Sequence, residues 1–153
     1  MAVAPLPGEA TVSWAILVVD DSLTTRALLR AAFEAQGARV LEAENGRDGL
    51  WRARSEHVDL IVCDIHMPVM DGLEMIQELR KLPDYRTTPV FVLTSDATLS
   101  RAADGKKAGA DAWVVKPVNP ASLWKAVEKA LLGKPARAAS GGGPGKPPRN
   151  DGQ

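Results

Sequence analysis

The chain has 153 residues, of which 45% are hydrophobic and 25% charged, as is typical of one globular domain with its own core. Its 19 basic and 19 acidic residues balance, so no global field attracts it to nucleic acid or to an anionic membrane. No apolar run approaches the ~20 residues that a membrane span needs. A single cysteine, Cys63, allows no internal disulfide. We therefore expect a cytoplasmic protein without membrane insertion or direct nucleic-acid binding.

The two ends of the chain differ in composition from its middle. Residues 1–13 are rich in proline and small residues, and residues 133–153 consist mainly of Gly, Pro, Ala and basic residues. Such segments cannot bury enough apolar area to offset chain entropy, so we expect a disordered leader and a disordered basic tail. A docking segment is the alternative interpretation of the tail. One domain is expected over residues 14–132.

Short apolar runs alternate with segments of helical periodicity through the middle of the chain. In chain order, they predict a strand at 15–19, a helix at 24–37, a strand at 38–44, a helix at 46–56, a strand at 58–64, a helix at 72–82, a strand at 89–95, a helix at 99–109, a strand at 112–117 and a helix at 120–132. Gly37 closes the first helix and Pro83 stops the third. Asn119 caps the last helix, with Pro120 at its first position. The helix at 99–109 is poorly patterned because Gly105 interrupts it.

Five strand–helix units of this kind predict an α/β fold. Strands that are apolar throughout are covered on both faces, which indicates a doubly wound parallel sheet with helices on either side. Right-handed crossovers leave few topologies to choose among. In such sheets, functional groups gather at the carboxyl ends of the strands.

Polar and charged side chains occur where four of these strands end. The first strand runs into Asp20 and Asp21, the third ends in Asp64, the fourth in Thr94, and the fifth in Lys116. Taken alone, an aspartate in such a place is most often a helix cap, and a lysine is a solvated side chain. Together they bring three carboxylates, a hydroxyl and an ammonium to one edge of the sheet.

Three carboxylates at one place predict a bound cation. Their mutual repulsion raises the pKa of at least one of them unless a positive charge lies among them. A divalent ion that prefers oxygen ligands satisfies the cluster, and Mg²⁺ fits a site with few protein ligands and several waters. The expected cofactor is Mg²⁺ or Mn²⁺, held at Asp20, Asp21 and Asp64.

Four motifs, "LVVDDS", "VCDIHMPVMDG", "VLTSDA" and "VVKP", resemble those of response-regulator receiver domains, the chemotaxis-type phospho-acceptors of two-component signalling. The resemblance spans residues 14–132 and follows the strand ends in order. It implies a five-stranded flavodoxin-like sheet in the order 2-1-3-4-5, which is known for this family.

The resemblance assigns the phosphoryl chemistry to three side chains. Asp64 is expected to be the phospho-acceptor, Lys116 to bring positive charge to the phosphoryl oxygens, and Thr94 to offer a hydroxyl to another oxygen. It also implies a cis Lys116–Pro117 peptide bond. A receiver of this kind catalyses its own phosphorylation and slow dephosphorylation, and it is not otherwise an enzyme.

The resemblance also implies a ligand set for the metal. Asp21 and Asp64 are expected to coordinate Mg²⁺ directly, and Asp20 to act through water. The main-chain carbonyl of His66 completes the protein ligands. The imidazole of His66 is expected to face solvent, because Mg²⁺ prefers oxygen; a phosphohistidine or a metal ligand are the alternatives.

Further residues are expected to carry or tune the signal. In the family, the hydroxyl residue at the Thr94 position and an aromatic residue at the Trp113 position move together on phosphorylation. His66 and Asp96 flank the phosphoryl site and are expected to tune dephosphorylation. By contrast, Cys63 is expected to be a buried packing residue, and His57, with no partner in view, a surface residue.

The expected partners follow from the same resemblance. A sensor histidine kinase or a histidine phosphotransfer domain supplies the phosphoryl group. No helix-turn-helix or basic recognition helix follows the receiver, so we expect a stand-alone regulator that acts through protein contacts. Its target is expected to bind the face formed by the fourth helix, the fifth strand and the fifth helix.

Three other functions remain as alternatives. The domain can serve as a phosphoryl shuttle or sink within a relay. A haloacid-dehalogenase-like phosphatase also uses an aspartyl intermediate, but it needs a second aspartate where this chain has His66. A flavin carrier on the same fold needs a Ser/Thr/Gly-rich phosphate loop after the first strand, where Asp20 and Asp21 would repel the phosphate.

Overall fold

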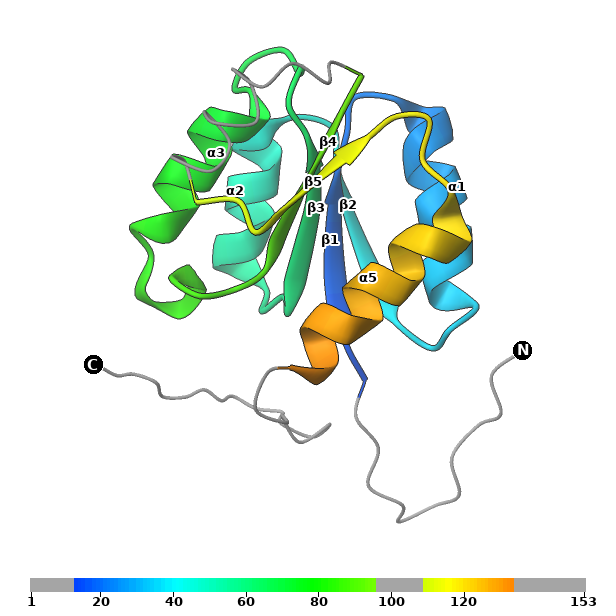
Figure 1. Cartoon of the computed structure of the whole chain (residues 1–153). Coiled ribbons are helices and arrows are strands. Elements are labelled where there is room, and N and C mark those ends of the chain that lie inside the picture. The colour runs from blue at the N-terminus through cyan, green and yellow to red at the C-terminus, as the bar shows by residue number, and fades with distance from the viewer. Residues whose placement is uncertain (1–12, 96–108, 134–153) are drawn as a thin grey trace.

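The computed structural model describes residues 13–95 and 109–133 (Figure 1). In chain order, the elements are β1 Ala15–Val19, α1 Leu23–Glu34, β2 Arg39–Ala43, α2 Gly46–Ser55, β3 Leu60–Asp64, α3 Gly72–Arg80, a 3-10 turn Pro83–Tyr85, β4 Val90–Thr94, β5 Ala112–Val115 and α5 Pro120–Leu132. The predicted helix at 99–109 lies almost wholly outside the described residues, as do most of the predicted leader and tail. The domain limits at residues 14 and 132 therefore stay predictions.

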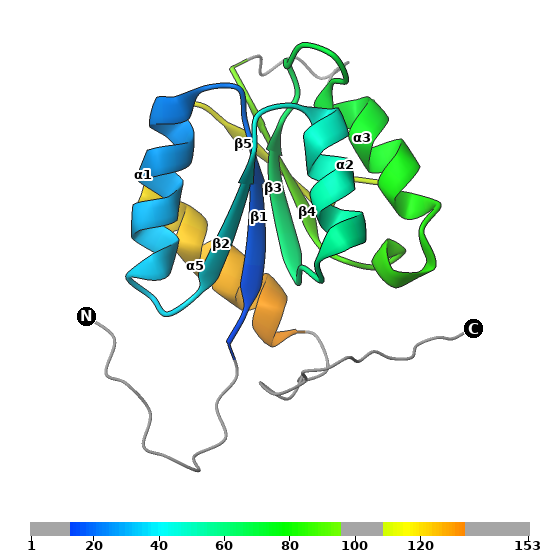
Figure 2. The ribbon, with the colours of Figure 1, turned by 180° about the vertical axis from the view of Figure 1, so that it is seen from behind.

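The five strands form one parallel sheet in the order β2-β1-β3-β4-β5. Helices α2 and α3 cover one face and α1 and α5 cover the other, as the opposite views in Figures 1 and 2 show. The predicted doubly wound fold and its strand order are confirmed. The chain forms β2 on one side of β1 and then crosses back to form β3 on the other side, so the topological switch point lies between β1 and β3.

The inner strands are buried along their whole length, as their uninterrupted apolar runs predicted. All five residues of β1, β3 and β4 are buried, whereas the edge strands β2 and β5 are partly exposed. Successive side chains alternate between two cores. Leu17 and Val19 pack on the side of α2 and α3, and Ile16 and Val18 pack on the side of α1 and α5. No helix in the described ranges is long and apolar enough to cross a membrane.

Side chains that accept backbone hydrogen bonds start the four described α-helices. These caps are Ser22, Asn45, Asp71 and Asn119. The cap of α1 follows directly after Asp20 and Asp21, so the start of this helix lies beside the predicted metal site. The sequence overestimated the length of α3, which ends at Arg80 because Pro83 opens a separate 3-10 turn.

The loop from β3 to α3 is held tightly against its surroundings. The Gly72 amide donates to the Ile65 carbonyl at 2.9 Å, and the Gly46 amide donates to the Met70 carbonyl at 2.9 Å. A Cβ atom at Gly72 would collide with the main-chain oxygen of Asp64. Within this loop, Val69 has a φ of 71°, a strained value for a β-branched residue. The main chain around Asp64 is therefore fixed by close packing.

We predict that Gly72→Ala destabilises the domain by about 1–3 kcal/mol, because the new methyl group must push the Asp64 main chain aside. Urea unfolding measures the change. Gly133→Ala is the matched control: the atoms nearest to its new methyl group would lie 3.5 and 3.6 Å away, an ordinary contact distance. Equal stability of the two variants would contradict the close packing at Gly72.

Candidate functional site

The carboxyl edge of the sheet brings together the three aspartates that the sequence singled out. Asp20 and Asp21 follow β1, and Asp64 ends β3, the neighbouring strand. One carboxylate oxygen of each lies within 4.8 Å of the others. Asp20 is fully buried and Asp64 is 6% exposed, whereas Asp21 is exposed. Two of the three carboxylates are therefore removed from water while close to one another.

Lys116 is the residue after β5, and its side chain extends towards this cluster. Its Nζ donates to Asp20 Oδ2 at 3.1 Å and lies 3.5 Å from Asp64 Oδ2. The Lys116 amide also donates to the Thr94 carbonyl at 2.7 Å, which fixes the chain where it leaves β5. The peptide bond from Lys116 to Pro117 is cis, as the resemblance implied. The ammonium thus bridges the ends of β1 and β3.

Asp20 and Asp21 differ in how they are held. Asp20 Oδ1 accepts from the Ser22 amide at 2.9 Å, and its other oxygen accepts from Lys116. The Asp21 side chain makes no hydrogen bond or ion pair to any described residue. Asp20 is thus buried and both of its oxygens accept hydrogen bonds, whereas Asp21 is exposed and its position depends on the main chain.

The surroundings shift the pKa of two groups at this site. Burial, followed by the charge of Asp20, raises the pKa of Asp64, and Lys116 offsets only part of this rise. For Lys116, burial opposes the charged form, but the attraction of Asp64 and the hydrogen bond to Asp20 prevail, so its pKa is raised. Burial is thus the main cause of the shift at Asp64, whereas the neighbouring aspartates cause the shift at Lys116.

The donor set fits a divalent cation that prefers oxygen. Three carboxylates face one ammonium, and the raised pKa of Asp64 shows that this ammonium does not offset burial and repulsion. An ion such as Mg²⁺ takes carboxylate oxygens as protein ligands and keeps several waters. Because Asp21 is exposed, one side of the cluster is open to solvent, as such an ion requires.

Three further predicted residues lie at or near the same edge. Thr94 is fully buried at the end of β4, whose Leu93 pairs with Asp64 in the sheet. His66 is exposed and follows Asp64 by two residues. Asp96 lies outside the described residues, so its predicted place beside the site stays a prediction. Cys63 is fully buried, and burial raises the pKa of its thiol far above the usual range, which fits the packing role expected for it.

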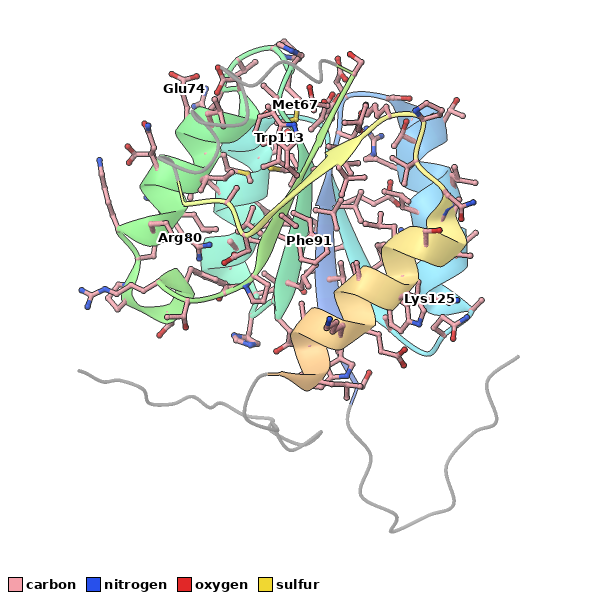
Figure 3. The ribbon with its side chains drawn as sticks, viewed as in Figure 1. Met67, Glu74, Arg80, Phe91, Trp113 and Lys125 are labelled. Carbon is pink, nitrogen blue, oxygen red and sulfur yellow. The ribbon has the colours of Figure 1, made fainter. Side chains whose placement is uncertain are left out.

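Trp113 is a half-buried residue of β5. It packs against the core on the side of α2 and α3, as does Met67 of the loop that follows Asp64; Figure 3 labels both side chains. Its Nε1–H is buried and has no hydrogen-bond acceptor in the described part of the chain. Among the described residues, the indole is therefore held by packing alone. The position predicted for an aromatic switch is thus occupied by a side chain with one donor that no described residue satisfies.

The interpretation of His57 as an isolated surface residue is wrong. Its Nε2 lies 3.0 Å from Oδ1 of the buried Asp59, and its ring stacks on Tyr85. Asp59 also accepts from the Ala15 amide at 2.8 Å, at the amino end of β1. This group therefore fastens the end of the sheet opposite to the aspartate cluster. The spacing of two residues places His57 and Asp59 within reach of each other, but it gives no sign that Asp59 is buried.

An ion-pair network on α1 and β2 was also missed. Arg26 Nη1 donates to the main-chain oxygen of Asp20 at 2.6 Å, and its Nε donates to Glu42 at 2.9 Å. Arg30 donates to the other oxygen of Glu42 at 2.6 Å. Arg26 and Glu42 also line a cavity of about 350 Å³ between α1, β2 and α2. None of the three clustered aspartates lines this cavity.

Comparison with known proteins gives a consistent result. A family model described as response regulator receiver domain matches residues 16–128. PilH of Pseudomonas aeruginosa is 37% identical over 118 residues, which cover 77% of this chain and 98% of PilH. The transcriptional regulatory protein ResD of Bacillus subtilis is 37% identical over 117 residues, which cover 76% of this chain and 47% of ResD.

Solved structures support the same assignment. The chemotaxis response regulator CheY4 of Vibrio cholerae matches with a TM-score of 0.74 and 34% identity, covering 77% of this chain and 98% of CheY4. The receiver domain of sensor histidine kinase PA1611 from Pseudomonas aeruginosa, with magnesium coordinated in its active-site cleft, matches with a TM-score of 0.73 and 25% identity, covering 78% of this chain and 98% of that domain. The chain belongs to the response regulator receiver domain family, the phospho-accepting receivers of two-component signalling.

Proposed function

We propose that Asp64 is the phospho-acceptor of this receiver, and that it takes the phosphoryl group from a phosphohistidine on a sensor kinase or phosphotransfer domain. One observation carries the proposal: Lys116 Nζ, from the end of β5, lies within 3.5 Å of carboxylate oxygens of both Asp20 and Asp64. A cation placed against a buried, charge-crowded carboxylate is the arrangement that an incoming phosphoryl group requires.

In the transfer, a carboxylate oxygen of Asp64 attacks phosphorus as the phosphorus–nitrogen bond to the donor imidazole breaks. The imidazole keeps the bonding electron pair and takes up a proton. The product is an acyl phosphate on Asp64. Little covalent chemistry is needed beyond this, so catalysis comes mainly from positioning and charge. Lys116 offers a compact positive charge to the phosphoryl oxygens, and Thr94 offers its hydroxyl.

The protein ligands for Mg²⁺ would be Asp21 and Asp64 directly, Asp20 through water, and the main-chain carbonyl of His66. When bound, the ion supplies positive charge that offsets the phosphoryl oxygens. The residues of this chain contribute a fixed set of oxygens at the ends of β1 and β3. Within that set, the Ser22 amide and Lys116 hold Asp20, and Lys116 also faces Asp64.

Decay of the acyl phosphate and signal output involve residues around this centre. We assign His66 and Asp96 the role of tuning the access of water to the phosphoryl group. Output is proposed to pass from Thr94 and Trp113 to a target that binds the face of β5, α5 and the helix predicted at 99–109. A domain over residues 14–132 and a cytoplasmic location remain part of the proposal.

We predict that acetyl phosphate with Mg²⁺ adds one phosphoryl group to the protein, seen as a single mass increment in intact-mass spectrometry. The Asp64→Asn variant should show no increment, because the amide is not a nucleophile towards phosphorus. Omitting Mg²⁺ should reduce the increment strongly in the native protein. An increment that persists in Asp64→Asn would place the acceptor elsewhere.

We also predict that Asp64→Asn raises the stability of the metal-free protein at pH 7, by roughly 1 kcal/mol. The raised pKa of Asp64 means that the folded protein holds this proton more tightly than the unfolded chain. The free energy of unfolding of the native protein therefore falls as pH rises from the usual aspartate range through the raised pKa. The gain from the substitution should vanish at acid pH.

Urea unfolding at several pH values measures this gain, with the exposed Asp84→Asn as the control. Mg²⁺ should reverse the order at pH 7, since it stabilises the native site by mass action and binds the variant less tightly. A metal-free variant less stable than the native protein would mean that the Lys116 ion pair outweighs burial and repulsion.

We predict that phosphorylation, or binding of a beryllofluoride mimic, changes the fluorescence emission of Trp113 and amide exchange in residues 109–116. The reason is that Trp113 is held by packing, so a small differential interaction at the site suffices to move it. Emission is best read in a variant lacking Trp14, Trp51 and Trp124, with the same variant carrying Asp64→Asn as the control. Exchange changes confined to residues 20–26 and 64–72 would exclude output through this face.

A further inference from the structure

The exposed Asp21 depends on its backbone for its position. Its side chain has no hydrogen bond or ion pair to a described residue, whereas Asp20 is held by the Ser22 amide and by Lys116. A metal ligand must nevertheless be held close to its working geometry. The peptide unit that joins Asp20 to Asp21 therefore decides where the Asp21 carboxylate lies.

One side chain fastens this peptide unit. Arg26 Nη1, from the first turns of α1, donates to the main-chain oxygen of Asp20 at 2.6 Å. On the other side of Asp21, the Ser22 amide is tied to Asp20 Oδ1 at 2.9 Å. We propose that Arg26 is a positioning residue for Asp21 and thereby sets the Mg²⁺ affinity of the site. The inference rests on the proposed magnesium site.

Arg26 is in turn held by the edge strand of the sheet. Its Nε donates to Glu42 Oε1 at 2.9 Å, while Arg30 donates to Glu42 Oε2 at 2.6 Å. The Arg26 side chain is 15% exposed and that of Glu42 is 24% exposed. The hydrogen bond from Arg30 is the main cause that lowers the pKa of Glu42, so this carboxylate stays charged at neutral pH. The bond to Glu42 thus holds the Arg26 guanidinium so that Nε points to Glu42 and Nη1 points to the Asp20 carbonyl.

The contacts of Arg26 depend on the planar guanidinium, which holds two N–H donors at fixed positions. Nε donates to Glu42 of β2, and Nη1 donates to the carbonyl of Asp20, the residue after β1. A lysine ammonium keeps the charge, but it is a single donor centre on a differently shaped stem and cannot reproduce these two contacts. Arg26→Lys therefore keeps the positive charge while it removes the two fixed contacts, so it tests the positioning role apart from charge.

The charge of Arg26 and its proposed positioning of Asp21 predict opposite effects of Arg26→Met on Mg²⁺ affinity. Loss of a cation near the aspartates should strengthen Mg²⁺ binding if only charge mattered, by Coulomb's law. Loss of the bond to the Asp20 carbonyl should weaken it, because the peptide unit before Asp21 is released. Substituting groups that orient metal ligands typically lowers affinity about 10- to 100-fold.

The test is a calorimetric titration of the full-length protein with MgCl₂. We expect Arg26→Met and Arg26→Lys each to weaken Mg²⁺ binding about tenfold. Arg30→Met is the matched control: it removes a guanidinium from the same carboxylate without touching Asp20, so its affinity should stay close to that of the native protein. Thermal unfolding of each variant is recorded alongside.

Two results would overturn the inference. Tighter binding in Arg26→Met with an unchanged Arg26→Lys would mean that only charge matters. Affinity losses that follow the loss of thermal stability across all three variants would mean a merely structural role. A native protein that binds no Mg²⁺ would instead refute the proposed metal site.

Amide exchange without metal gives a second readout that does not depend on that site. The Ser22 amide, which donates to Asp20 Oδ1, should exchange faster in both Arg26 variants than in Arg30→Met, because the peptide unit is released. Unchanged exchange at this amide would overturn the positioning role, whatever the Mg²⁺ titration gives.

Discussion

The repulsion among Asp20, Asp21 and Asp64 is the interaction on which the carboxyl edge of this sheet depends. Three carboxylates face one ammonium, and the pKa of Asp64 is raised by burial and by this crowding. A fold can hold such a cluster only if the rest of the structure resists its separation. Burial of β1 and β3 along their whole length supplies that resistance, because moving either strand end would disturb both cores. The repulsion within the cluster therefore favours a cation between the three carboxylates.

Each of the three aspartates is held in a different way. Asp64 is fixed by its strand and by the close contact of Gly72 with its carbonyl, and Asp20 by the Ser22 amide and Lys116. Asp21 has backbone support alone. These supports come from several segments that are distant in sequence, so the site is assembled only when the sheet is complete. At the proposed magnesium site, affinity would therefore depend on the folding of the whole domain, and not on a local loop.

The strands and the aspartates and lysine at their ends could be predicted from the sequence, because two signals indicate each strand end: the end of an apolar run and the polar residue that follows it. These two signals are enough to place Asp64 and Lys116 at one edge of a sheet. The Arg26–Glu42 pair could not be predicted, because its partners lie 16 residues apart on different elements, and charged residues on a helix usually indicate a solvated face. The contact between His57 and Asp59 was missed for a related reason: burial of Asp59 is set by β1, which its local sequence does not reveal.

The unequal burial of the strands also bears on how a signal leaves the site. The strands that carry the aspartates and Thr94 are buried throughout, whereas β5, which precedes Lys116, is partly exposed along its length. If Lys116 were to move, the inner strands could not adjust without disturbing two cores, whereas β5 could. Trp113 lies on that strand with a buried donor that no described residue satisfies, so moving it breaks no side-chain hydrogen bond with the described part of the chain. The edge strand β5 is therefore the strand that can shift most easily when the charge at the site changes.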